Sequence, residues 1–137
     1  MIKAYRNLEE IFMPTNIKIT LKNVTVEAQL TDTACAKAIA DKLPLEAFLN
    51  EWGDEFYFEI PVRNALDETA TNMVKVGDIG YWPPGHALAI FFGPTPLSKG
   101  NNPVPASEVN IVGRITSDAT LLRKAKGASN IKLEKAT

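Results

Sequence analysis

The side chains able to transfer protons do not form a catalytic set in this sequence. Glu55 and Glu59 lie four residues apart in an expected strand, which separates their backbones by ~13 Å, too far for a close carboxylate pair. His86, the only histidine, follows Pro-Pro-Gly and has no serine or carboxylate at a spacing that would preset a general base. We interpret the glutamates as solvated strand residues and the histidine as a surface turn residue.

Other reactive residue types are also poorly placed for chemistry. Cys35, the only cysteine, has no partner for an internal disulfide, and one thiol with one histidine cannot build a structural zinc site. His86 with Asp78 or a glutamate is weak evidence for a metal site. The serines lack the context of a nucleophile elbow, and the scattered glycines form no phosphate-binding loop. We predict no metal site and no cofactor.

Aromatic residues instead indicate an apolar groove for a small molecule or an extended peptide. Sites for small ligands are mostly hydrophobic, with a few polar groups that orient the ligand. The residues expected to line such a groove, or to supply its polar groups, are Tyr57, Phe58, Trp82, Phe92, Glu55, Arg63 and His86. For Trp82 and Phe92 the alternative is burial in the core, because large aromatic side chains are usually structural.

The groove residues belong to strands that the sequence pattern predicts. The sequence predicts three hairpins, over residues 16–30, 45–60 and 77–96. Apolar and polar residues alternate in the first, whereas the third consists of two apolar strands. Their turns fall at Lys22-Asn23, Gly53-Asp54 and Pro83-Pro84-Gly85. Proline presets φ for a turn, and glycine accepts the positive φ that closes one. In residues 55–60 both faces of the strand carry an aromatic side chain, so one face is expected to be core and the other partly covered.

Two helices and a long loop complete the pattern. One helix is expected to be capped by Thr31 or Asp32 and to end at Pro44. A strand over residues 109–115 is followed by a helix capped by Ser117 and by a last strand around residues 131–133. Residues 93–106 form a proline-rich loop, and loops of this length are often functional, so it could rim a pocket. The alternative is a surface loop that does not border a pocket.

The chain is expected to form one domain, residues 15–137, after an N-terminal extension of residues 1–14. The extension has the apolar stripe of a short helix, which either packs on the domain or makes a subunit contact. We expect a monomer or a weak homodimer. A net charge of −1 and the lack of a basic block interleaved with aromatic residues argue against nucleic acid and membrane partners. The basic cluster Arg123-Lys124-Lys126 is interpreted as the solvated end of a helix. The absence of a signal peptide pattern predicts a cytoplasmic protein.

Three segments together resemble a prokaryotic family of cyclophilin-like proteins. They are LNEWGDEFYFEIPV, GDIGYWPPGHALAIFFGPTP and PASEVNIVGRI, and they occur in the family's order. The resemblance covers about residues 17–133. It implies a mainly β fold, a closed eight-stranded barrel with a helix capping each end.

The resemblance predicts the function less well than the fold. Cyclophilins isomerise the peptide bond before proline with the help of an arginine, and Phe58 stands where the resemblance places that residue. A glutamine and a histidine of the family's pocket are replaced by Ile90 and Val109. We therefore expect a binding protein without efficient prolyl isomerase activity. The alternative is an isomerase or another enzyme that reuses the groove, with Arg63 or Arg114 as the substitute donor.

Overall fold

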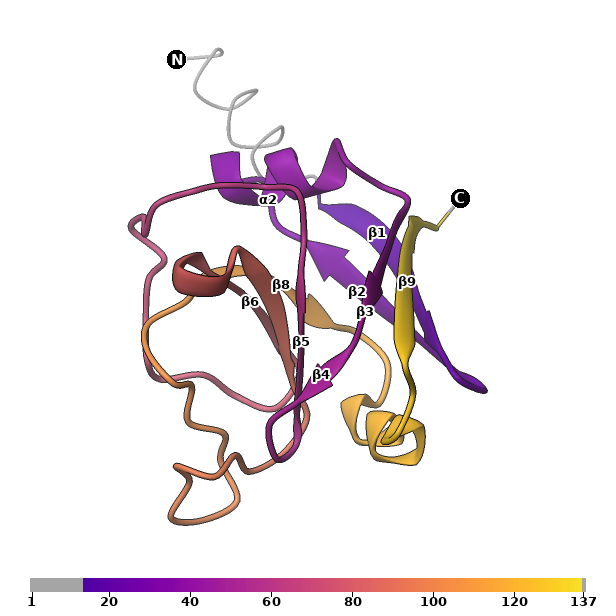
Figure 1. Ribbon diagram of the computed structural model, residues 1–137. Coiled ribbons are helices and arrows are strands. Elements are labelled where there is room, and N and C mark those ends of the chain that lie inside the picture. The colour runs from indigo at the N-terminus through magenta and orange to yellow at the C-terminus, as the bar shows by residue number, and fades with distance from the viewer. Residues whose placement is uncertain (1–13, 137) are drawn as a thin grey trace.

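The chain folds into a single antiparallel sheet that curls into a nearly closed barrel (Figure 1). The structure, a computed structural model, describes residues 14–136. Its strands are β1 (Thr15–Leu21), β2 (Val24–Leu30), β3 (Leu45–Phe48), β4 (Asn50–Glu51), β5 (Glu55–Glu59), β6 (Asp78–Trp82), β7 (Ala87–Phe91), β8 (Asn110–Ile115) and β9 (Asn130–Lys135). They follow the order β3-β9-β1-β2-β8-β6-β7-β5-β4 around the barrel.

The two ends of this sheet are neighbouring pieces of one extended segment, residues 45–51. β3 pairs with β9, whereas β4 pairs with β5, so the segment changes partners at Leu49. The Leu49 backbone N–H donates to the carbonyl of Ser129 at 2.9 Å and continues the first ladder. The expected count of eight strands is corrected to nine because this segment divides. Its pairing is corrected too, since only its second half forms a hairpin with residues 55–59.

The other two expected hairpins are confirmed. β1 and β2 pair along their whole length, with the turn at Lys22 and Asn23. β6 and β7 pair from Ile79–Ile90 to Trp82–Ala87, and the expected turn between them is a 3-10 helix, η1 (Pro83–Gly85). The aromatic segment is therefore a hairpin in the wall of the barrel.

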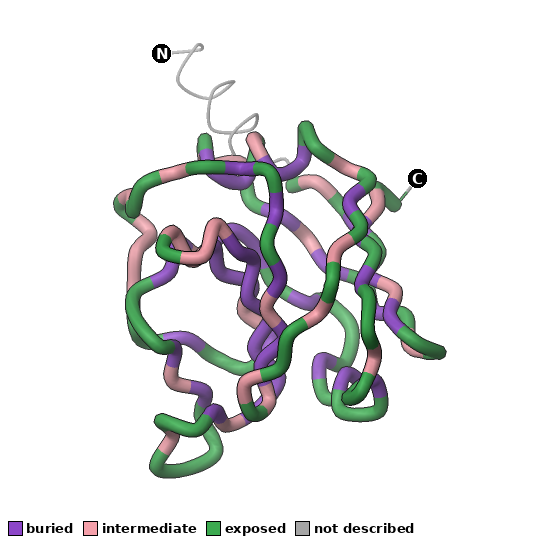
Figure 2. The backbone as a smooth tube through the Cα atoms, in the orientation of Figure 1, coloured by how far each residue is buried: buried purple, intermediate pink, exposed green. Residues whose placement is uncertain are grey.

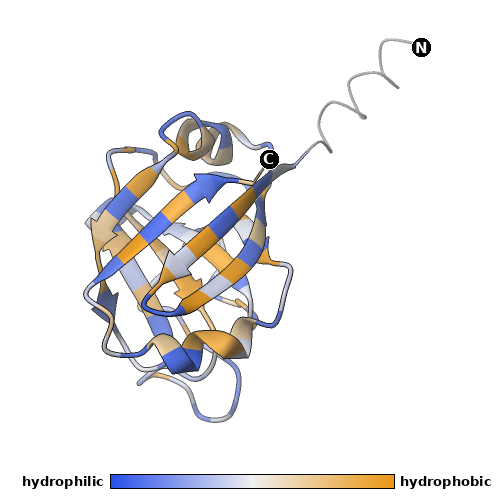
Figure 3. Ribbon diagram, turned by 90° about the vertical axis from the view of Figure 1, so that its right-hand side faces the viewer, coloured by the Kyte–Doolittle hydropathy of each residue, from blue (hydrophilic) through white to orange (hydrophobic). Residues whose placement is uncertain are grey.

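A helix lies at each end of the barrel (Figure 3). α2 (Ala34–Ala40) packs against β2 and β8, and η2 (Ala119–Ala125), a 3-10 helix, packs against β2. The caps differ from those expected. The Thr33 hydroxyl accepts from the Ala36 N–H at 3.1 Å, and the Asp118 carboxylate accepts from the Thr120 N–H at 3.0 Å. Within the described residues no helix is long and apolar enough to cross a membrane.

The barrel interior is a continuous hydrophobic core, and Figure 2 shows that buried residues recur along the strands. Alternate residues of each strand point inward because side chains on a strand alternate between faces. On β5 the inward residues are Phe56 and Phe58, both fully buried. Phe56 packs against Phe92 with ring centroids 4.6 Å apart. The aromatic residues at these positions thus belong to the centre of the barrel.

A second, smaller hydrophobic layer covers the outer face of β5, β6, β7 and β8. Its buried members are Val74, Ala89, Phe91 and Val109, with Tyr57, Trp82 and Ile111 partly buried against them. The layer forms because the segments 60–77 and 92–109 cross this face. β7 is consequently buried on both faces, from Ala87 to Phe91.

Two buried polar side chains hold the first of these segments in place. The Asn110 amide donates to the Ala65 carbonyl at 2.9 Å and accepts from the Asp67 N–H at 2.8 Å. The Tyr81 hydroxyl donates to the Val62 carbonyl at 2.6 Å. These bonds satisfy the backbone of a segment without regular structure, as burial of its polar groups requires. The expected N-terminal helix, up to residue 13, lies outside the described residues.

Close packing of β2 against β8 predicts a large effect of a small substitution. A Cβ at Gly113 would collide with the carbonyl oxygen of Gln29 and come within 3.2 Å of the Leu30 Cα. Because backbone atoms cannot move aside without breaking the ladder, Gly113→Ala should lower the free energy of unfolding by about 1–3 kcal/mol. Urea denaturation measures this change.

Gly100→Ala is the matched control for this prediction. No heavy atom lies within 4 Å of the position that its Cβ would take, and Gly100 is exposed. We expect a change within about 0.5 kcal/mol. Equal effects of the two substitutions would contradict the close approach of β2 and β8.

Candidate functional site

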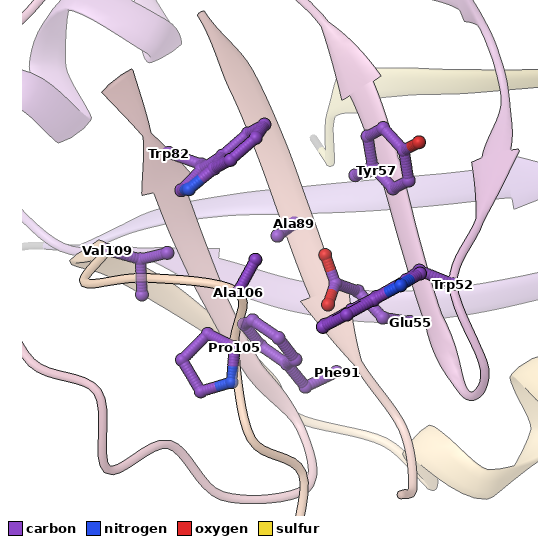
Figure 4. A pocket seen from close by; sticks show the side chains of 9 residues that line it. All are labelled: Trp52, Glu55, Tyr57, Trp82, Ala89, Phe91, Pro105, Ala106 and Val109. Atoms are coloured by element: carbon purple, nitrogen blue, oxygen red, sulfur yellow. The ribbon is translucent and has the colours of Figure 1, made fainter. Parts of the chain in front are cut away.

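A pocket of about 210 Å³ opens on the outer face of the barrel, within the second hydrophobic layer (Figure 4). Strands β5 and β7 form its floor, and the chain before β8 forms its rim. The residues that line it are Trp52, Glu55, Tyr57, Trp82, Ala89, Phe91, Pro105, Ala106 and Val109. Its surface is mostly apolar, with four aromatic side chains.

The floor consists of two directly paired positions on neighbouring strands. Glu55 of β5 faces Phe91 of β7, and Tyr57 faces Ala89. Side chains at paired positions of an antiparallel sheet stand on the same face, roughly 5 Å apart at Cβ. The small Ala89 side chain opposite Tyr57 leaves the depression in which a ligand can lie.

Trp82 forms one wall and is fixed from two sides. A Cβ at Gly85 would meet the Trp82 indole ring at 2.8 Å, so the ring can lie over η1 only because residue 85 has no side chain. On the other side the indole N–H donates to the Ser107 hydroxyl at 2.7 Å. The wall is therefore tied to both the β6–β7 turn and the rim.

The rim is the proline-rich loop, residues 93–106, for which the sequence left open either a pocket rim or a plain surface loop. The loop begins beside the turn before β5, where the Asp54 N–H donates to the Pro94 carbonyl at 2.9 Å. Thr95 braces its interior by donating to the Val104 carbonyl at 2.5 Å. Its far end is pinned by the paired backbone bonds between Thr71 and Val109, at 3.0 and 3.1 Å. These bonds place Pro105 and Ala106 at the pocket.

Glu55 is the polar feature of the pocket. It is only 8% exposed, and its Oε1 atom has no hydrogen-bond partner among the described residues. Figure 4 shows its carboxylate turned into the space that the lining residues surround. Burial disfavours the charged form and raises the pKa of this carboxyl from 4.5 to about 7. A carboxyl group that changes charge near neutral pH therefore faces an apolar cavity.

The carboxylate of Asp54, in the turn next to Glu55, is paired with cations. Asp54 is paired with Lys126 at 2.6 Å and with Arg123 at 3.3 Å. Both cations come from η2 or its end, beneath the barrel. They neutralise Asp54, and the residues that line the pocket in the described chain include no lysine or arginine.

Three of the seven residues expected at the groove do line the pocket: Glu55, Tyr57 and Trp82. Arg63 and His86 are not among the lining residues. They lie together elsewhere, with Arg63 Nη1 and His86 Nε2 3.2 Å apart.

Phe58 and Phe92 require a correction, because both are fully buried in the barrel core and contribute nothing to the pocket. The neighbours Tyr57 and Phe91 take the outward positions. The runs Phe-Tyr-Phe and Ile-Phe-Phe are apolar on both faces, so alternation alone could not tell the inward residue from the outward one.

The sequence also missed residues that only the tertiary structure brings together. Trp52 precedes the turn into β5, Ala89 lies in the middle of β7, and Val109 ends the rim loop. The available signal was the aromatic character of Trp52 beside Glu55 and the length of the loop. Within residues 14–136 no group of three or more acidic, histidine or cysteine residues is placed to hold a metal ion.

Comparisons with known proteins agree with this architecture. The family described as Cyclophilin-like matches residues 15–134. A hypothetical protein from Archaeoglobus fulgidus, solved in solution, is similar over 91% of this chain and 97% of its own, with 33% identity and a TM-score of 0.76. McbB, solved in complex with tryptophan, is similar over 86% of this chain and 44% of its own, with 17% identity and a TM-score of 0.63. No curated protein matches the sequence.

The buried carboxyl predicts that stability depends on pH in a particular direction. Below pH 4.5 Glu55 is protonated in the folded and the unfolded chain, and its contribution is neutral. Between 4.5 and about 7 the folded chain keeps the proton that the unfolded chain releases, so the free energy of unfolding falls as pH rises. Above about 7 the loss is constant, on the order of 3 kcal/mol.

Glu55→Gln removes this loss, because the amide is uncharged at every pH. Compared with the wild type, the variant should be more stable at about pH 8 and gain little at about pH 5, as measured by urea denaturation. Glu59→Gln, on the same face of β5 but exposed, is the control and should show no such difference. A Glu55→Gln effect that is independent of pH would refute the assignment.

Proposed function

The chain belongs to the cyclophilin-like family, and we propose that it is a binding protein that holds a small molecule in the aromatic pocket without efficient prolyl isomerase activity. The observation that carries the proposal is a preformed, largely apolar cavity lined by four aromatic side chains and one carboxyl group. Such a combination is typical of sites that bind small organic ligands.

The size of the pocket favours a small molecule over an extended peptide. A volume of about 210 Å³ lies below the ~300–1,000 Å³ usual for pockets that bind drug-sized ligands. That space accepts a compact molecule with one or two rings. McbB, which shares the fold, was solved with tryptophan, a molecule of this class. A peptide would have to extend beyond the pocket over the exposed surface next to it.

The pocket is poorly equipped for prolyl isomerisation. Rotation about the peptide bond faces a barrier of ~18–20 kcal/mol, and catalysis requires groups that stabilise the twisted amide more than the planar one. An arginine serves this purpose in cyclophilins. β5 reads Glu-Phe-Tyr-Phe-Glu, so whichever of its residues faces a ligand, none is an arginine. Arg63, the nearest arginine in sequence, interacts with His86 instead.

One observation favours a second function for the same pocket. A carboxyl group with a pKa near 7 in an apolar cavity is suited to general acid–base catalysis, because both protonation states are accessible at neutral pH. Glu55 would then take a proton from a bound ligand or donate one to it. This candidate shares the binding step with the first, so tests of binding come before tests of turnover.

Filling the pocket should abolish binding. Ala89 lies on its floor, so Ala89→Leu places three additional carbon atoms in the ligand's space. In a screen of small aromatic compounds by ligand-observed NMR, we expect hits on the wild type that the variant loses. Ala65→Leu, at an exposed position in another segment, is the control and should keep them. Hits that persist in Ala89→Leu would place binding elsewhere.

The absence of efficient isomerase activity is tested separately. In a protease-coupled assay with a proline-containing peptide, the protein should leave the rate of isomerisation close to the uncatalysed rate, since no cationic donor lines the described pocket. Acceleration at rates typical of cyclophilins, lost in Ala89→Leu, would refute this part of the proposal.

A further inference from the structure

We propose that the pocket selects ligands that carry a basic nitrogen next to a compact apolar group, with Glu55 as the anion that pairs with the protonated nitrogen. This inference rests on the proposed binding function and names the class of ligand. The Glu55 carboxyl group and the aromatic rings around it supply the geometry that supports this preference.

One oxygen of the Glu55 carboxyl group lacks a hydrogen-bond partner among the described residues. Polar groups that are buried in proteins are nearly always hydrogen-bonded, and an exception needs an explanation. Glu55 is more than nine-tenths buried and lines the pocket, and Figure 4 shows its carboxylate turned toward the cavity, yet its Oε1 atom, which has almost no accessible surface, has no partner in the described chain. A ligand that pairs with the Glu55 carboxyl group and donates a hydrogen bond to it, after a small rotation of that group, would remove the deficit.

The charge of that ligand is constrained by the residues around Glu55. The turn next to Glu55 shows how the chain neutralises a carboxylate when it supplies the cation itself, since Asp54 is paired with Lys126 and Arg123. No lysine or arginine is among the residues that line the pocket. Above a pH of about 7, where Glu55 is ionised, an anionic ligand would meet an uncompensated like charge. A purely apolar ligand would bury the carboxyl group further without a partner.

The aromatic surroundings of Glu55 act in the same direction. Trp52, Tyr57, Trp82 and Phe91 all line the same space as Glu55. The faces of aromatic rings carry negative electrostatic potential and attract cations, with Trp the strongest. Trp82 donates its indole N–H to Ser107, so this polar edge is already used within the protein. The rings therefore reinforce the preference of the carboxylate for a cation and offer an apolar surface to the rest of the ligand.

Binding of a cation should be coupled to release of a proton. The free pocket holds a protonated Glu55 below a pH of about 7, and a bound cation stabilises the ionised form, which lowers the pKa. Other charged or titratable groups near this space are Tyr57 on β5, Asp54 in the adjacent turn, which is already paired, and the exposed Glu108 on the rim loop. β7 contributes only Ala89 and Phe91 to the lining. Glu55 is therefore the expected source of the proton.

A matched series of probes tests the inference directly. Phenethylamine, 2-phenylethanol and 3-phenylpropionate share a phenyl ring and a short chain but are a cation, a neutral alcohol and an anion. By titration calorimetry at about pH 8, the amine should bind roughly tenfold or more tightly than the alcohol, with the anion weakest. At about pH 6, repeating the titration in buffers of different ionisation enthalpy should show proton release with the amine alone.

Two variants locate the effect. Glu55→Gln should reduce amine binding to the level of the alcohol and abolish proton release, while it retains binding of the alcohol because the rings are unchanged. Glu59→Gln is the control and should keep the preference for the amine, since this exposed carboxylate is not among the lining residues. Circular dichroism and urea denaturation establish that both variants are folded.

The outcomes separate the two proposals. Equal or tighter binding of the alcohol, lost in Ala89→Leu, would overturn the inference about the basic nitrogen and keep the binding function. A preference for the amine that survives Glu55→Gln would overturn the role of Glu55. If none of the probes binds and the fragment screen gives no hit that depends on Ala89, the proposed binding function itself fails.

Discussion

Strand β7 carries apolar side chains on both faces, and the rest of the structure is arranged to keep both faces away from water. Leu88 and Ile90 point into the barrel, whereas Ala89 and Phe91 point outward. A barrel alone would leave the outward pair exposed. The long segments before β6 and before β8 are drawn across this face because covering it is worth roughly 25 cal/mol for each Å² of apolar surface removed from water. The pocket is the part of this outer layer that the two segments leave unfilled.

Glu55, the carboxyl group in this layer, is an exception to the rule that buried polar groups in proteins have hydrogen-bond partners. A buried carboxyl without a partner costs stability, and the position opposite Phe91 would be filled more favourably by an apolar residue. Asp54, one residue earlier, shows that the same turn can hold a neutralised carboxylate. Unfavourable electrostatics that persist in a concave site are characteristic of functional residues, since the free energy lost on folding is recovered when a ligand binds.

The sequence predicted the parts of this structure that depend on local pattern. The turn at Lys22 and the hairpin around Pro83 follow from residues adjacent in the chain, and the family resemblance supplied the barrel. The sequence pattern could not predict which face of β5 points into the barrel, because Phe56, Tyr57 and Phe58 are all aromatic. The sequence predicts that segment 45–51 pairs only with the strand after it, because nothing local indicates that the pairing changes at Leu49. The pocket depends on contacts between distant residues, such as Trp82 with Ser107, and these have no local signature.

The rim loop has a consequence for how such a barrel can diversify. It is fastened to the barrel at its two ends, by the bond from Asp54 to Pro94 and by the bridge between Thr71 and Val109, and its interior is braced by its own side chains. Of the residues between these anchors, Pro105 and Ala106 line the pocket and Ser107 holds Trp82 in place. Changes confined to this short stretch of the gene can therefore reshape one side of the cavity without altering the strand pairing. The carboxyl group and the aromatic floor, which belong to the strands, would stay the same.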